Sequence, residues 1–262
     1  EFWFDKTGEG GRLYVRLPGD RNPNGLRIEA ARYMCNLDLV GDLRYVDISG
    51  LAFRFNNAYW DLTATFATHV DVVNAAIRLR GNVDHVAIRN CRFEHVSKGM
   101  RIECNGAMDR VFDVTIADNE ILETDHGALE MSDYITYAVT PALPPLDNLQ
   151  ILRNRIHRIG QRGFPPHCHG HAVIVNFPQT AEIAGNVLSR TWGSGLFIFG
   201  GKPNGDANRE VPLTRILIHH NRLEDSLLTC NDWGGIETWQ GGPFYVYNNI
   251  SANPGGFWYP SH

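Results

Sequence analysis

A six-residue pattern, aliphatic-x-x-Asn-x-aliphatic, recurs along this chain and constrains its fold more than any other feature. The clear copies centre on Asn119, Asn154, Asn186 and Asn221, and weaker copies centre on Leu51, Cys91 and Asn249. Successive asparagines are separated by 28 residues (Asn221 to Asn249) to 35 residues (Asn119 to Asn154). A motif that returns at such a period is typical of a solenoid, in which one structural unit is stacked repeatedly.

The residues around each motif alternate between apolar and polar, as in Val114-Thr115-Ile116, and this period of two indicates strands. A second short strand is expected after each Asn, following a glycine-containing turn, as at Gly127 and Gly195. No stretch shows a convincing helical period. Strand, Asn turn, strand and loop would form one coil of a parallel β-helix, with equivalent strands about 4.8 Å apart. The sequence predicts about seven coils.

The stacked asparagines have a physical reason to recur. An amide can donate to one neighbouring coil and accept from the other, which would satisfy backbone groups in a buried turn. An ordinary turn-forming role explains one such Asn but not five at one phase. Cys91 occupies the same position, so a buried thiol is expected there, with a disulfide as the alternative. The other cysteines are Cys35, Cys104, Cys168 and Cys230, and the five show no metal-ligand spacing.

With this repeat, the chain resembles the right-handed parallel β-helix superfamily of carbohydrate-active proteins, and most of all its glycoside hydrolases. The resemblance covers about residues 40 to 262. The segment from Phe2 to Asp5, with Leu13 to Val15, resembles the hairpin that precedes the coils in some β-helix glycosidases. We therefore expect a lead-in hairpin at 1–30 and a β-helix domain at 31–262, as part of a longer protein.

Composition narrows the classes of partner. The net charge of -5 gives no basic footprint for nucleic acid, and no apolar run of 18 residues predicts a membrane span. The first residues of the sequence do not show the pattern of a signal peptide, and a secreted or periplasmic location is expected if the chain is mature or truncated. The oligomeric state stays open.

The intervals between asparagines exceed the roughly 20 residues that the shortest solenoid repeats need, so extra residues must leave as loops. The surplus lies at 134–147, 160–169 and 202–213, next to the second strand of the coil. Long loops on a rigid scaffold commonly wall a binding groove, although tolerated surface insertion is the alternative.

One acidic motif occurs twice, as Asp125-His-Gly-Ala-Leu-Glu130 and as Asp232-Trp-Gly-Gly-Ile-Glu237. Alternation sends both glutamates outward on one face, three coils or about 14 Å apart. Paired catalytic carboxyl groups lie about 5 to 9.5 Å apart, so Glu130 and Glu237 cannot flank one glycosidic bond. Asp232 with Glu237, or either acid with a carboxylate on a neighbouring coil, could.

The catalytic candidates are therefore Asp232, Glu237 and Glu130. The expected substrate-binding residues are outward polar groups and aromatic rings near these acids, namely Asp125, His126, His171, Trp233, Trp239, Phe197 and Trp258. The plainer alternatives are that the aspartates cap turns, that the glutamates are solvated and that loops cover the aromatic rings.

The segment from Asn231 to Trp239 also resembles a stretch common in β-helix glycosidases, in which Asp is followed by Gly-Gly-Ala-Ile-Tyr. The match includes Asp232, whereas Glu237 replaces the usual Tyr and Trp233 replaces a Gly. The resemblance implies an acid role for Asp232 and leaves the role of Glu237 open.

Three functions follow. The first is a glycoside hydrolase that uses a carboxylic acid and a carboxylate and needs no cofactor. The second is a polysaccharide lyase or uronate epimerase; the β-helix enzymes of this kind use Lys or Arg, often with Ca²⁺, and the resemblance implies Lys98 and Arg101 beside Glu103 for this role. The acidic composition disfavours an anionic substrate. The third is a noncatalytic glycan-binding module, such as part of a tailspike or adhesin. All three predict a polysaccharide or oligosaccharide as the partner.

Overall fold

The computed structural model describes residues 2–8, 10–57, 74–104, 109–132, 146–161, 170–200, 214–228, 233–239 and 242–255. These residues are almost entirely strands and turns, and the one helix among them is the short 3-10 turn Pro18–Asp20. The predicted all-β fold is confirmed. No described helix has the length and hydropathy needed to cross a membrane.

The chain divides into two compact units, Glu1–Ala30 and Ala31–His262. In the first unit, β1 (Phe2–Thr7) and β2 (Gly10–Val15) pair antiparallel, with Trp3 opposite Tyr14. Both of these rings are mostly exposed. The strands of the second unit are parallel throughout.

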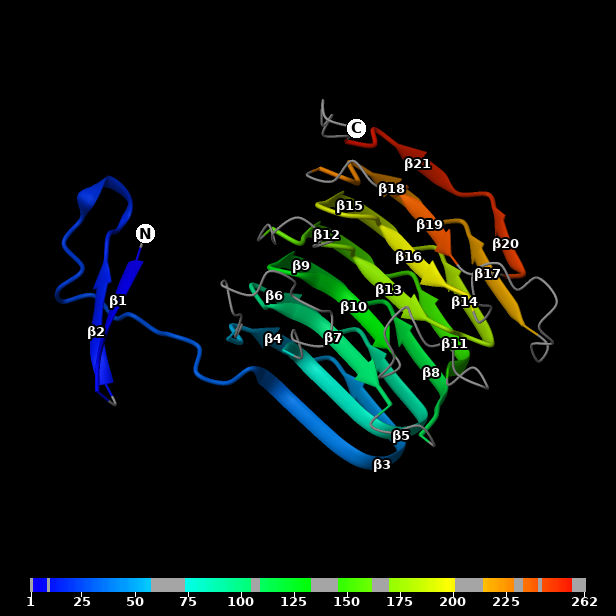
Figure 1. The fold of residues 1–262 in the computed structure, drawn as a ribbon, viewed down its shortest axis with the longest axis horizontal. Coiled ribbons are helices and arrows are strands. Elements are labelled where there is room, and N and C mark those ends of the chain that lie inside the picture. Colours follow the sequence, from blue (N-terminus) through cyan, green and yellow to red (C-terminus); the bar gives the residue numbers. More distant parts are fainter. Residues whose placement is uncertain are drawn as a thin grey trace. The chain divides into compact units, whose positions relative to one another are not determined.

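The second unit consists of three columns of stacked parallel strands (Figure 1). Two long strands, β3 (Cys35–Ser49) and β5 (Ala75–Arg89), each run through the first column and then the second. The first column continues with β7 (Lys98–Glu103), β10 (Gly127–Ser132), β13 (Val173–Asn176), β16 (Leu196–Phe199) and β19 (Ile236–Trp239). The second continues with β8 (Val111–Ala117), β11 (Leu146–Leu152), β14 (Thr180–Ala184), β17 (Arg215–His219) and β20 (Phe244–Tyr247).

The third column is a separate seven-stranded sheet of short strands. Its members are β4 (Ala52–Arg54), β6 (Arg92–Glu94), β9 (Glu120–Thr124), β12 (Arg155–Ile159), β15 (Val187–Thr191), β18 (Arg222–Glu224) and β21 (Ile250–Ala252). The chain therefore visits the first, second and third columns in the same order in seven circuits, from β3 and β4 to β19, β20 and β21.

The expectation of two strands per coil was wrong, because each circuit passes through three columns. From β7 onward a circuit contains three strands, and in the first two circuits β3 and β5 each span two columns. The sequence predicts no separate strand directly after the ladder residue, where β12 follows Asn154. These third-column strands have only three to five residues, as β6 and β9 show, which is too short for a period of two to be recognised.

Two facing glycines bend the long strands where they pass from the first column to the second. Gly41 and Gly81 pair in register and have φ values of 121° and 125°. A Cβ on Gly81 would lie 2.4 Å from the carbonyl oxygen of Gly41. Both the left-handed backbone and this close approach require glycine.

The predicted asparagine ladder lies in the turn between the second and third columns. The Asn154 amide nitrogen donates to the Ile116 carbonyl (2.9 Å), and Asn154 also donates to the Asn186 side-chain oxygen through its backbone N–H (2.9 Å). The pattern repeats from Asn119 to Asn249. Cys91 continues the position as a buried free thiol near the Ile48 carbonyl (3.6 Å), as predicted.

The interior between the columns is apolar. Side chains at alternate strand positions point inward and form one continuous cluster of aliphatic residues, with Phe93 among the largest fully buried members. The side chains between these inward positions point away from the core. On the first column these outward positions carry the predicted site residues.

Candidate functional site

The outward face of the first column holds one row of side chains in strict register. Glu130 pairs with Arg101 on one side and with Ile174 on the other, and the row continues through Phe197 to Glu237. Its inward neighbours, such as Leu129, belong to the core. Three steps of about 4.8 Å separate Glu130 from Glu237, which gives about 14 Å, as the repeat predicts.

The first half of this face is a charge cluster, which we define as Arg78, Lys98, Arg101, Glu103 and Glu130. These five side chains come from β5, β7 and β10, and none is more than 8% exposed. Charged groups are rarely buried to this extent unless they are paired.

Every side chain of the charge cluster lies beside an opposite charge of the same cluster. Lys98 Nζ donates to Glu130 Oε2, and Arg101 Nη1 donates to Glu130 Oε1 (2.9 Å). Arg101 Nε donates to Glu103 Oε2 (2.5 Å), and Arg78 Nε lies 3.3 Å from Glu103 Oε1. Glu130 therefore has the environment of a paired anion rather than that of a proton donor.

Burial and neighbouring charge shift the two cations of β7 in opposite directions. Burial lowers the pKa of Lys98, and the attraction of Glu130 opposes this only in part. Burial would also lower the pKa of Arg101, but the charges of Glu130 and Glu103 outweigh it, so the pKa is raised. Arg101 is thus a permanent cation, whereas Lys98 loses its proton more readily than a solvated lysine does.

The second half of the face is an aromatic cluster, which we define as Phe177, Phe197, Phe199, Trp233 and Trp239 together with His171. Phe197 lies at its centre: its ring centroid is 4.7 Å from that of Phe199, 6.1 Å from that of Trp233 and 6.3 Å from that of Trp239. Phe197 itself is buried, whereas Trp239 is 38% exposed. The cluster therefore presents an accessible ring on a rigid aromatic base.

Glu237 is half-buried beside this accessible ring. Its Oε2 accepts from the backbone N–H of Gly234 (2.9 Å), and its Oε1 accepts from Trp239 Nε1 (2.5 Å). A Cβ on Gly234 would lie 3.3 Å from Glu237 Oε2, so glycine makes room for the carboxylate. Both oxygens are oriented by the protein, and the group keeps some access to solvent.

His171 packs against two rings of the aromatic cluster and is buried. Its ring stacks on Phe197, with centroids 4.3 Å apart, and meets Trp233 edge to face at 5.1 Å. Its Nδ1 accepts the backbone N–H of Ser194 (2.9 Å), which places the proton of the neutral ring on Nε2. His171 is therefore a buried support for the rings of Phe197 and Trp233.

Asp125 and His126 form the turn that leads into β10. The Asp125 N–H donates to the Val96 carbonyl (3.1 Å), and the His126 N–H donates to the Ser97 carbonyl (2.8 Å). Asp125 is half-buried, and His126 is 5% exposed. These bonds tie the turn to the preceding circuit.

Two predicted site residues, Asp232 and Trp258, lie outside the described residues. The same holds for the loop segments 133–145, 162–169 and 201–213, so the expected walls of the groove are not described. Within the described part of the chain, no group of three or more His, Cys, Asp or Glu side chains is arranged to hold a metal ion.

Sequence reasoning missed Arg78 and Phe177 and considered Lys98, Arg101 and Glu103 only for a lyase. The alternation Ile77-Arg78-Leu79 does mark Arg78 as an outward charge between two core residues. Its proximity to Glu103 follows only from the register between β5 and β7.

Comparisons with known proteins do not identify a family for this chain. Searches against family models, curated proteins and solved structures found no match to this chain.

Proposed function

We propose that residues 31–262 form a right-handed parallel β-helix and that the chain is a glycoside hydrolase acting on a complex polysaccharide or oligosaccharide. Seven circuits of parallel strands and a continuous asparagine ladder support the fold. The outward face of the first column is the proposed substrate groove. Such an enzyme would be secreted or periplasmic, where polysaccharides are accessible.

The observation that carries this proposal is the carboxylate of Glu237 beside the accessible ring of Trp239. Sugar rings present flat C–H surfaces that stack on aromatic faces, while a small number of polar groups fixes their orientation. Glu237 is held by two hydrogen bonds and is in contact with such a ring. Trp233 and Trp258 are assigned to the same binding surface, with Phe197 and His171 as its support.

Hydrolysis needs a second carboxyl group within about 5 to 9.5 Å of the first. We assign this role to Asp232, five residues before Glu237, with one acid protonating the leaving oxygen and the other acting as base or nucleophile. Glu130 lies too far from Glu237 to share the bond and is engaged by Lys98 and Arg101. Its proposed role, with that of Asp125 and His126 in the adjoining turn, is to hold the floor of the groove in place, since Glu130 and His126 are buried.

The test is the release of reducing sugar from a panel of neutral and acidic polysaccharides. Glu237→Gln and Asp232→Asn should each reduce the rate by at least a hundredfold, as expected for loss of an acid or base. Glu224→Gln, at a partly exposed position on β18 in the third column, is the matched control and should retain the wild-type rate. Full activity in both Glu237→Gln and Asp232→Asn would refute the proposal.

A lyase or epimerase is the second candidate, because the lowered pKa of Lys98 suits a base that removes a proton beside a uronate carboxylate. Arg101 lies beside it as a permanent cation. A lyase would then expel the glycosidic oxygen and form an unsaturated uronate with ultraviolet absorbance, whereas an epimerase would return a proton to the opposite face and leave a saturated uronate of inverted configuration. Lys98→Met would abolish either product while Glu237→Gln would not. Binding without either product would instead support a noncatalytic glycan-binding module.

A further inference from the structure

A groove on the second column is separate from the face just described. It has a volume of about 310 Å³ and lies across β11, β14 and β17. None of its lining residues belongs to the first column. Its size is at the lower end of the range for sites that bind small molecules.

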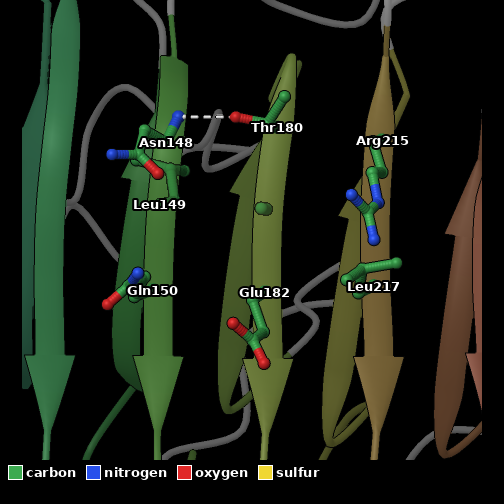
Figure 2. Close-up of a pocket in the computed structure, with 8 residues that line it drawn as sticks. Asn148, Leu149, Gln150, Thr180, Glu182, Arg215 and Leu217 are labelled. Carbon is green, nitrogen blue, oxygen red and sulfur yellow. Dashed lines mark hydrogen bonds between the residues drawn. The ribbon is translucent and has the colours of Figure 1, made fainter.

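The register sets the polar groups of this groove side by side. Gln150 pairs with Glu182, and Glu182 pairs with Leu217, while Thr180 pairs with Arg215. Figure 2 shows Gln150, Glu182 and Leu217 on three neighbouring strands, with Asn148, Thr180 and Arg215 nearer the other end of the same strands. The groove thus offers an amide, a carboxylate and a guanidinium on one rigid sheet surface.

One end of the groove is held in place by internal hydrogen bonds. The Asn148 N–H donates to Thr180 Oγ1 (2.9 Å), and the Asn148 amide donates to Asp113 Oδ1 (2.8 Å). The Thr180 hydroxyl donates to Asp147 Oδ1 (2.5 Å). Groups fixed in this way lose little conformational entropy when a ligand binds.

The groups in the middle of the groove keep free bonding capacity. Glu182 accepts from His219 Nε2 (3.1 Å) through Oε1, no other described residue bonds to its side chain, and that side chain is 41% exposed. Gln150 accepts from Thr115 through its oxygen (3.3 Å), which leaves its amide N–H groups. Arg215 is exposed and forms no ion pair with any residue in the described ranges. The free groups include both donors and acceptors.

An aromatic surface continues the groove. Leu217 pairs with Tyr245 on β20, which is 50% exposed. The neighbouring Tyr247 stacks on His219, with ring centroids 4.8 Å apart and planes at 12°. A row of hydrogen-bonding groups that leads to exposed rings fits a ligand with many hydroxyl groups and flat apolar faces.

We propose that this groove is an accessory site that binds a neutral segment of a glycan chain. The single negative charge of Glu182 is balanced by Arg215, so the lining attracts neither polyanions nor polycations. Gln150, Glu182 and Arg215 bind hydroxyl groups, and Tyr245 stacks on a sugar ring. The ligand class rests on the proposed function, whereas the site itself needs no catalytic residue.

The test is affinity electrophoresis of the full chain in native gels that contain galactomannan, arabinoxylan or hydroxyethyl cellulose, with alginate as the anionic probe. At least one neutral polymer should retard the wild type. Arg215→Ala and Tyr245→Ala should each weaken that affinity at least fivefold. Arg222→Ala, at an exposed position on β18, is the matched control and should be retarded as strongly as the wild type, relative to its own mobility in a gel without polymer.

Because the first-column face would also bind glycan, the measurement is repeated in a Trp239→Ala background. The same fivefold loss on adding Arg215→Ala there identifies an independent site. The proposal is overturned if no neutral polymer retards the protein, if only alginate does, or if Arg215→Ala and Tyr245→Ala leave retardation unchanged. A protein that binds through the groove but cleaves nothing would refute the hydrolase proposal alone.

Discussion

The two halves of the first-column face share one register and differ completely in chemistry. The charge cluster lies on β5, β7 and β10, whereas β16 and β19 hold Phe197, Phe199, Trp239 and Glu237. The other members of the aromatic cluster, His171, Phe177 and Trp233, lie in the turns next to β13 and β19. A buried ion pair tolerates the loss of neither partner, while an aromatic base tolerates the loss of its exposed ring. The charge half is therefore suited to rigidity, and the aromatic half to contact with a ligand.

The largest expected effect is the loss of stability on removing Arg101, the central cation of the charge cluster. Arg101→Met leaves Glu103 without its closest partner and Glu130 with Lys98 alone, in a site that is 4% exposed at Arg101. The free energy of unfolding should fall by about 3 to 5 kcal/mol, measured by urea denaturation. Arg222→Met removes an exposed ion pair with Glu224 and should cost less than about 1 kcal/mol. Equal losses in the two variants would contradict the structural role of the charge cluster.

In the aromatic half, loss of the buried ring of Phe197 and loss of the accessible ring of Trp239 should have different effects on stability and on glycan binding. Phe197→Ala removes the ring on which His171, Phe199 and Trp233 pack, and should cost about 3 kcal/mol of stability. Trp239→Ala should cost clearly less, because the ring is partly exposed, but should weaken glycan binding. Thermal unfolding and affinity electrophoresis measure the two effects. A Trp239→Ala protein that binds glycan normally would argue against the proposed stacking surface.

The smallest effect is a pH dependence confined to the charge half. Since the pKa of Lys98 is lower in the folded protein than the 10.5 of a free lysine, the folded state releases this proton first as the pH rises. The penalty of burying the charged amine is complete below the folded pKa and disappears as the pH approaches 10.5. The unfolding free energy of the wild type should therefore rise relative to Lys98→Met across this window. A constant difference between the two proteins would show that Lys98 keeps its ordinary pKa.

Much of the architecture could be predicted because its signals are local. The alternation around Ile116 indicates a strand, and the recurring Asn indicates stacking, so parallel strands and the ladder from Asn119 to Asn249 both follow from the sequence. The outward placement of Glu130 and Glu237 follows from the same period of two. Third-column strands such as β6 were missed because three residues contain too little periodicity.

The chemistry of the face could be predicted only in part, because it depends on contacts between circuits. Whether Glu130 acts as an acid or as a paired anion depends on Lys98 and Arg101, which lie about one circuit earlier in the chain. Nothing in the sequence near Glu130 signals this pairing. The burial of His171 was likewise missed, because it results from Phe197 and Trp233 on later circuits.

The thiol at Cys91 interrupts the chain of amides that links the later circuits. Cys91 donates its backbone N–H to the side-chain oxygen of Asn119, but it has no side-chain amide that could bond to the first circuit, β3 and β4. In stacked repeats each unit is coupled only to its neighbours, so stability is shared along the stack like links in a one-dimensional lattice. At this junction the first circuit is held to the second by the paired backbones of β3 and β5 and not by the ladder. The circuits from Asn119 onward are joined both by strand pairing and by the ladder, so they should open together.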